Sequence, residues 1–138
     1  MTLFGWMPGS KKPRLRLAQS LGAFTRPEQG DISPLYVFFE VENADRETIE
    51  VSRVHVTPKD GDPVQVELLE GDRDLPHILE PGDTARYWTQ TRPLARILAD
   101  AGYGGRPRLR LVVEDGLGNT HEKRFAFRVD EYLRLRDE

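Results

Sequence analysis

The sequence predicts an all-β protein, a seven-stranded antiparallel sandwich with one short helix between the fifth and sixth strands. Three observations support this prediction. Short runs alternate apolar and polar residues with a period of two, which is typical of half-buried strands. Prolines and glycines separate these runs as turns, and the 138 residues suffice for one core. The sequence has no cysteine, so the fold cannot depend on disulfides.

Alternation first identifies two strands near the N-terminus. The run 14–18 alternates arginine with leucine, and the run 35–43 is apolar at every second position. The opposite parity of the second run carries Tyr36 and Phe38, where a solvated sheet surface is ordinarily polar. We expect both runs to be half-buried strands.

The run 48–58 changes phase in its middle. Its apolar residues hold one parity before Ser52 and the other parity after Arg53, which predicts a β-bulge at this pair. The run 64–69 follows after the turn 59–63, whose Asp-Gly pair suits positive φ angles. We expect two further strands here.

The segment "LEPGDTARYW", residues 79–88, predicts a turn and a new strand. Pro81 fixes φ and Gly82 tolerates positive φ, so a tight turn should precede the alternating residues. Tyr87 and Trp88 are adjacent, and in a strand one of them must therefore face inward while the other faces outward. We expect Trp88 to be buried and Tyr87 to lie at the rim.

The last two runs, 108–115 and 121–130, flank Gly-Leu-Gly-Asn and predict a hairpin. Before them, apolar residues recur at helical spacing and predict a helix at about 92–101. Thr91 is placed to cap its N-terminus, and Gly102 is placed to adopt the left-handed conformation after its end.

The order of these runs resembles an immunoglobulin-like β-sandwich of the bacterial type without a disulfide. The octapeptide "PGDTARYW" is similar to the Pro-Gly-led fifth strand of such domains, and the helix replaces the usual link to the sixth strand. The cysteine pair and third-strand tryptophan of antibody domains are absent. The resemblance implies a sandwich domain over 14–130, a flexible or docked N-terminal segment 1–13 and a C-terminal tail 131–138. It also implies a binding role, although a fold does not fix a function.

Composition argues against several classes of protein. A formal net charge of −3 is unlike that of a dedicated nucleic-acid binder, whose domain is ordinarily basic. No run approaches the roughly 20 apolar residues of a membrane span. The basic residues near the N-terminus follow a short apolar stretch rather than precede it, unlike in a signal peptide. We therefore expect a cytoplasmic protein.

The sequence shows no pattern of catalytic or metal-binding residues. His55, His77 and His121 lie far apart at no metal-ligand spacing, and we expect them to be solvated. The acidic clusters 59–62 and 70–74 lack the spacing of a calcium loop. No serine lies in a nucleophile elbow and no cysteine is present. We therefore expect no enzyme activity, no cofactor and no metal.

The hairpin predicts a cationic surface. Its leucine, valine and phenylalanine residues take the inward parity, so five guanidinium groups should project from the other side. We call this set the arginine face: Arg106, Arg108, Arg110, Arg124 and Arg128. Like charges on paired strands need neutralisation. Carboxylates of a neighbouring strand, with Glu50 as a candidate, are one source of it, and an anionic partner held by forked arginine contacts is the other.

A second surface is apolar. Tyr36 and Phe38 need a cover, and the segment 3–7 offers Phe4 and Trp6. A homodimer through this face, or a different partner, would also cover them. Residues 1–26 contain five basic residues and no acid, but their two prolines disfavour a long amphipathic helix, so membrane-surface association is not expected.

The sequence therefore predicts a non-enzymatic protein-interaction module, an accessory protein of bacterial or phage type. Its partner is a protein, including a second copy of the same chain. The alternative is a domain that binds a small ligand or carbohydrate through loops near the helix. Tyr87, Tyr103 and His77 would then line the site.

Overall fold

The computed structural model describes residues 12–26, 31–32, 35–58, 64–68 and 70–134. These residues form eleven strands and two helices: β1 (Leu15–Gly22), β2 (Thr25–Arg26), β3 (Asp31–Ile32), β4 (Tyr36–Asn43), β5 (Ile49–Pro58), β6 (Val66–Glu67), β7 (Glu70–Gly71), β8 (His77–Leu79), β9 (Thr84–Gln90), α1 (Thr91–Asp100), β10 (Arg108–Asp115), β11 (Thr120–Ala126) and α2 (Val129–Tyr132). Neither helix in this described part has the length and apolar character that a membrane crossing requires.

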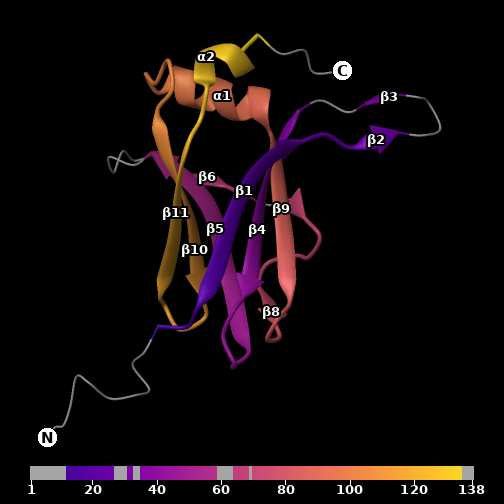
Figure 1. The fold of residues 1–138 in the computed structure, drawn as a ribbon. Coiled ribbons are helices and arrows are strands. Elements are labelled where there is room, and N and C mark those ends of the chain that lie inside the picture. Colours follow the sequence, from indigo (N-terminus) through magenta and orange to yellow (C-terminus); the bar gives the residue numbers. More distant parts are fainter. Residues whose placement is uncertain (1–11, 27–30, 33–34, 59–63, 69, 135–138) are drawn as a thin grey trace, which may run out of the picture.

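The strands build two antiparallel sheets (Figure 1). One sheet has four strands in the order β1-β4-β9-β7. The other has the order β11-β10-β5-β6, with β8 also paired to β5. β2 and β3 form a separate two-stranded ribbon that projects from the body. The predicted all-β antiparallel architecture is confirmed, but the assigned strands outnumber the seven that we expected.

Short strands account for much of the difference in number. Of the predicted strand 64–69, the structure assigns Val66–Glu67 as a strand that pairs with β5, and the backbone N–H of Leu68 also donates to the carbonyl oxygen of Val54 at 2.9 Å. β7 and β8 are two and three residues long, too short to show a period of two. Alternation identified the long strands because only these keep one face against the core over several residues.

The core lies between the two sheets. Val37, Phe39 and Val41 of β4 are fully buried, and the rings of Phe39 and Phe125 meet edge to face with 5.4 Å between their centroids. Aromatic contact between β4 and β11 thus joins the two sheets. These positions follow the inward parity that the sequence predicts.

The expected orientation at the end of β9 is wrong. Tyr87 is 1% exposed and belongs to the core, whereas Trp88 is half-buried on the outer side of the four-stranded sheet. Gly71 of β7 lies opposite Tyr87, and a Cβ added there would meet the tyrosine ring at 2.8 Å. The missing side chain of this glycine leaves space for the inward tyrosine.

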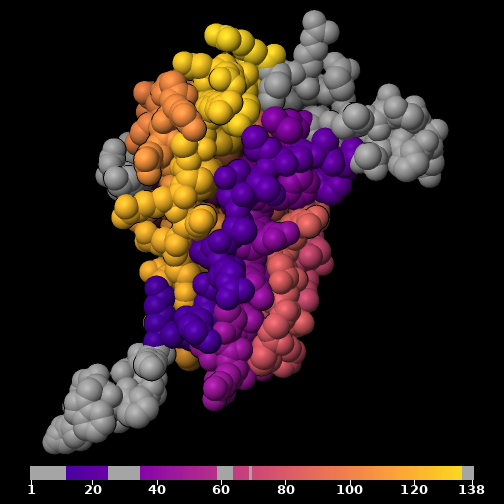
Figure 2. Space-filling model, in the orientation of Figure 1, coloured from indigo at the N-terminus to yellow at the C-terminus, as the bar shows by residue number. Residues whose placement is uncertain are grey.

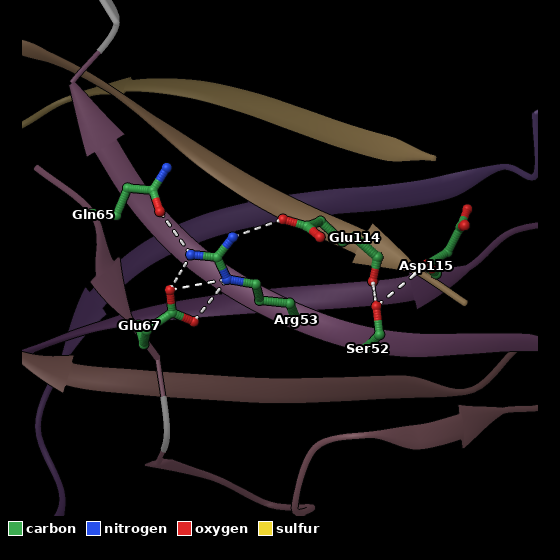
Figure 3. A network of polar contacts seen from close by, with 6 residues as sticks. All are labelled: Ser52, Arg53, Gln65, Glu67, Glu114 and Asp115. Atoms are coloured by element: carbon green, nitrogen blue, oxygen red, sulfur yellow. Dashed lines mark hydrogen bonds and ion pairs between the residues drawn. The ribbon is translucent and has the colours of Figure 1, made fainter. Parts of the chain in front are cut away.

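The β-bulge predicted near Ser52 is confirmed (Figure 3). Glu114 pairs with Arg53, while the next residue, Asp115, pairs with Val51, so Ser52 is the extra residue of β5. Its hydroxyl donates to the carbonyl oxygens of Glu114 at 2.9 Å and Asp115 at 3.3 Å. The side chain thus satisfies backbone acceptors where the ladder is interrupted.

The predicted helix is present as α1, one residue earlier than expected. Thr91 is its first residue and not its cap, because its hydroxyl donates to the carbonyl oxygen of Leu35 at 3.1 Å. Gly102 has a φ of 97° and takes the expected left-handed position after the helix. α1 covers one end of the sandwich together with α2 (Figure 1).

The chain continues its fold past residue 130, where we expected the domain to end. β11 stops at Ala126, and α2 then carries Val129, which is fully buried, and Tyr132. The ring of Tyr132 lies 4.8 Å from that of Phe127 between centroids. The pattern of Phe127 and Val129 resembled a strand because both residues are buried at alternate positions, although Val129 is helical.

Candidate functional site

The outer side of the five-stranded sheet is charged, and Arg53 lies in its most connected part (Figure 3). The Arg53 guanidinium donates to both carboxylate oxygens of Glu67, to Glu114 at 2.9 Å and to the side-chain oxygen of Gln65 at 2.7 Å. The hydrogen bond to the Glu67 carboxylate contributes most to raising the pKa of Arg53. In turn, the bond from Arg53 lowers the pKa of Glu67. This network connects β5, β6 and β10 across the outer surface.

His55 lies next to this network and is only 4% exposed. It pairs with Val112 on one side and Glu67 on the other, and its Nδ1 atom has no hydrogen-bond partner among the described residues. Burial first, and then the charge of Arg53, lowers its pKa. The expectation of solvated histidines is therefore wrong for His55, and also for His121, which is 6% exposed.

On the arginine face, Arg110 is already neutralised. It lies directly opposite Arg124 in the β10–β11 ladder, and its guanidinium forms an ion pair with Glu122 at 3.1 Å. Glu50, the candidate we expected, does not have this role. Its carboxylate lies beside Gly116 at the bulge end of the sheet.

The other members of the arginine face differ in their surroundings. Arg106, Arg108 and Arg124 are exposed and form no ion pair with any residue that the structure describes. Arg128 contacts Glu131 at 3.5 Å. The structure thus leaves three arginines available to other molecules at the helix-covered end of β10 and β11.

The predicted apolar face is an aromatic patch on the four-stranded sheet, formed by Phe24, Tyr36, Phe38 and Trp88. The ring of Phe24 lies edge-on over the other three, with centroid separations of 5.0, 5.4 and 5.4 Å. Under it Phe38 is only 8% exposed. The guanidinium of Arg86 lies 5.5 Å from the centroid of the Phe38 ring.

Phe24 was missed in the sequence because it lies just after the alternating residues of β1, in a segment without periodicity. Trp88 was missed because we placed it in the core. The proposed cover by residues 3–7, including Phe4 and Trp6, lies outside the described residues.

The residues of the predicted ligand loop do not converge. His77 Nε2 and the hydroxyl of Tyr87 are hydrogen-bonded, and their rings stack with centroids 5.9 Å apart. Burial raises the pKa of Tyr87 and lowers that of His77. Tyr103 follows α1, at the opposite end of the sandwich from β8 (Figure 1). Tyr87 thus belongs to the core with the half-buried His77 beside it, and the half-buried Tyr103 is separate from this pair.

A buried acid–histidine pair at the β10–β11 turn was not predicted. Asp115 Oδ2 lies 2.9 Å from His121 Nε2, while Asp115 Oδ1 accepts from the backbone of Leu117 and Asn119. The signal in the sequence is the aspartate immediately before Gly-Leu-Gly-Asn, since aspartate often bonds the backbone two residues on. Over the described ranges, no group of three or more His, Cys, Asp or Glu side chains is arranged to hold a metal ion.

Comparison with known proteins gives little further information. No protein-family model and no curated protein matches the sequence. A Bordetella pertussis crystal structure, provisionally assigned as ApaA, is 12% identical, with 86% of this chain and 95% of that chain covered and a TM-score of 0.40. The structural-genomics target SoR45 is 10% identical, with 90% and 93% covered and a TM-score of 0.42. Similarity at this level supports no functional inference.

Proposed function

We propose that the protein is a non-enzymatic interaction module with an immunoglobulin-like fold. Its binding surface is formed by Arg106, Arg108 and Arg124, and its ligand is an acidic segment of a partner protein. The observation that carries the proposal is the exposure of these three arginines without an ion pair to any described residue.

The strand order supports the immunoglobulin-like part of the proposal. In such sandwiches the first, second, fifth and fourth strands form one sheet, and the third, sixth and seventh form the other. The order β1-β4-β9-β7 opposite β11-β10-β5-β6 fits this scheme, with β6 as the extra strand of the second sheet. In the same scheme, α1 lies in the link between the fifth and sixth strands.

The charge arrangement supports an acidic ligand. Arg124 of β11 lies directly opposite Arg110 of β10, and Glu122 balances the charge of Arg110. Arg108 is two residues before Arg110 in β10 and therefore points to the same outer side of the sheet. Guanidinium groups form bidentate hydrogen bonds with carboxylates, so two free arginines on neighbouring strands can hold successive acidic side chains. A protein segment fits better than a nucleic acid because the whole chain carries a formal charge of −3.

Charge reversal tests this surface. We expect Arg108→Glu with Arg124→Glu to weaken binding of a fluorescent ten-glutamate peptide at low salt by about tenfold or more, since charged hydrogen bonds are lost. Arg96→Glu, an exposed arginine on α1, is the matched control and should leave the affinity unchanged. The same variants should be compared by affinity capture from the native host. Equal binding by the double variant and the wild type in both assays contradicts the proposal.

The alternative of a small-ligand or carbohydrate site near the helix remains a prediction without geometric support. Its three residues are split between the Tyr87–His77 pair and the helix end, as described above. A concave site with converging polar and aromatic groups would be required.

A further inference from the structure

A separate pocket lies at the end of the sandwich away from the helices. It is formed where the chain enters β1, beside the start of β11, and has a volume of about 440 Å³. We call it the basic pocket, after the side chains that line it: Lys12, Arg14, Arg16 and His121. β1 and β11 belong to different sheets but lie side by side along this edge (Figures 1 and 2).

The backbone brings the three cationic side chains together. They occupy alternate positions at the entry to β1 and therefore share one side of the extended chain. Arg14 is held in place, because its backbone N–H donates to Asp45 at 2.9 Å and its guanidinium donates to the carbonyl oxygen of Ala44 at 3.1 Å. Most of the guanidinium donors of Arg14 have no partner among the described residues.

Two carboxylates reduce the positive charge without removing it. Glu42 forms an ion pair with Arg16 at 2.9 Å, and Asp45 accepts from the backbone of Arg14. Neither acid lines the pocket. Lys12 forms no ion pair with a residue that the structure describes. The described lining of the pocket therefore has three basic side chains and no acidic one.

The wall formed by His121 is rigid. The ring is 6% exposed, and its Nε2 atom is 2.9 Å from Asp115 Oδ2. Asp115 is itself fixed by the hydrogen bonds from the turn, so the imidazole has little freedom to move. His121 therefore differs from an ordinary solvated surface histidine, because it is nearly buried and lies between a buried carboxylate and a cationic pocket.

A pocket of similar volume at the other end of the molecule provides a contrast. It is lined by Arg106 and Arg128, but also by Asp130 and Glu131. Arg128 contacts Glu131, and Asp130 accepts from the backbone N–H of Gly105 at 3.0 Å. The lining of that pocket thus includes two acidic side chains, whereas the described lining of the basic pocket includes none.

We propose that the basic pocket binds a phosphate group, carried either by a small metabolite or by a lipid headgroup. Guanidinium and ammonium groups are the usual protein ligands of phosphate, and the volume falls within the usual range of small-molecule sites. This site goes beyond the proposed function, since none of its residues belongs to the arginine face.

The direct test is a titration of the full-length protein with inorganic phosphate at constant ionic strength, followed by two-dimensional NMR. We expect saturable shifts at Arg14, Arg16 and His121. Lys12→Gln with Arg14→Gln changes only exposed side chains and should weaken the affinity by about tenfold, since two charged contacts are lost. Arg124→Gln, on the arginine face, is the matched control and should bind phosphate like the wild type.

Two further ligands distinguish the sources of the phosphate. Saturable binding of glycerol phosphate, without binding to vesicles of phosphatidic acid in phosphatidylcholine, assigns the site to a free metabolite. If the wild type binds the vesicles and the double variant Lys12→Gln with Arg14→Gln does not, the pocket is assigned to a lipid headgroup. The proposal is overturned if none of the three probes gives saturable binding, or if Arg124→Gln weakens it equally. If the acidic peptide does not bind the arginine face, the outcome of the phosphate titration is unaffected, because the two surfaces share no residue. Each proposal can therefore be refuted without the other.

Discussion

At the scale of single residues, Asp115 is the carboxylate on which the β10–β11 turn depends. Burial alone would raise its pKa, but hydrogen bonds from His121, Asn119 and Leu117 outweigh burial and hold the pKa below its usual value. When folding lowers the pKa of a carboxyl group, that group stabilises the fold at every pH above its pKa in the unfolded chain. The contribution is lost as the pH falls through the lower pKa of the folded protein. Asp115 therefore contributes fully at neutral pH.

We predict that Asp115→Asn lowers the free energy of unfolding at pH 7 by about 1–3 kcal/mol, because buried donors lose a charged acceptor. The difference from the wild type should shrink as the pH falls below about 4, because the carboxyl of the unfolded wild type is protonated there, whereas the folded one, with its lowered pKa, is protonated only at a lower pH. Urea unfolding followed by tryptophan fluorescence at several pH values measures both effects. Asp74→Asn, at an exposed position, is the control and should change stability by less than about 0.5 kcal/mol.

Tyr87 and Trp88 show what the sequence could and could not predict at this scale. Alternation required that one face inward and the other outward, and this is what the structure has. It could not identify the inward residue, because that depends on Gly71 in a two-residue strand. The sequence could not predict the hydrogen bond between Tyr87 and His77 either, because His77 lies in β8, a strand of only three residues.

We predict that Tyr87→Phe destabilises the protein by about 1 kcal/mol, because His77 loses a partner inside the fold. Chemical denaturation is the measurement. Tyr36→Phe, in the half-buried aromatic patch, should cost less. A larger loss for Tyr36→Phe would contradict the assignment of Tyr87 to the interior network.

At the scale of elements, α1 is stabilised by its packing on the sandwich. Its buried residues recur at helical spacing, and Leu98 is 1% exposed while Ile97 is 43% exposed. The sequence predicted this helix within one residue because amphipathic spacing is a local property. It could not predict α2, whose four residues continue an apparent strand pattern.

We predict that Leu98→Ala costs about 2–5 kcal/mol of unfolding free energy, the usual range for a leucine removed from a core. Ile97→Ala, the neighbouring aliphatic residue, should cost about 1 kcal/mol or less. Thermal and urea unfolding of both variants measure the difference. Similar losses for both would mean that α1 is not docked through Leu94 and Leu98.

At the scale of the whole molecule, the distribution of surfaces was only partly predictable. Parity placed Arg108 and Arg124 outward and Tyr36 and Phe38 on the outer side of the other sheet. The basic pocket was not predicted, because it requires β1 and β11, which are far apart in sequence, to lie along one edge. Contacts between sheets have no signature in local periodicity.

The aromatic patch gives a prediction at this scale. Phe24→Ala should uncover Phe38 and Trp88, and exposed apolar patches favour self-association. Sedimentation velocity over a range of concentrations should then show dimers that the wild type lacks at the same concentration. Leu117→Ala, which removes an 82% exposed side chain in the β10–β11 turn, is the control and should leave the mass distribution unchanged. An unaltered mass for Phe24→Ala would show that the patch does not drive association.

The bulge at Ser52 has a consequence for how the chain tolerates insertions and deletions. Before the bulge the odd-numbered residues Ile49 and Val51 face inward, and after it the even-numbered residues Val54 and Val56 face inward. Loss of this one position would exchange inside for outside along half of the strand. The middle of β5 should therefore not tolerate the insertion or deletion of a residue. In a library of single-codon deletions, folded proteins should be recovered far less often at this point than in the nearby loops.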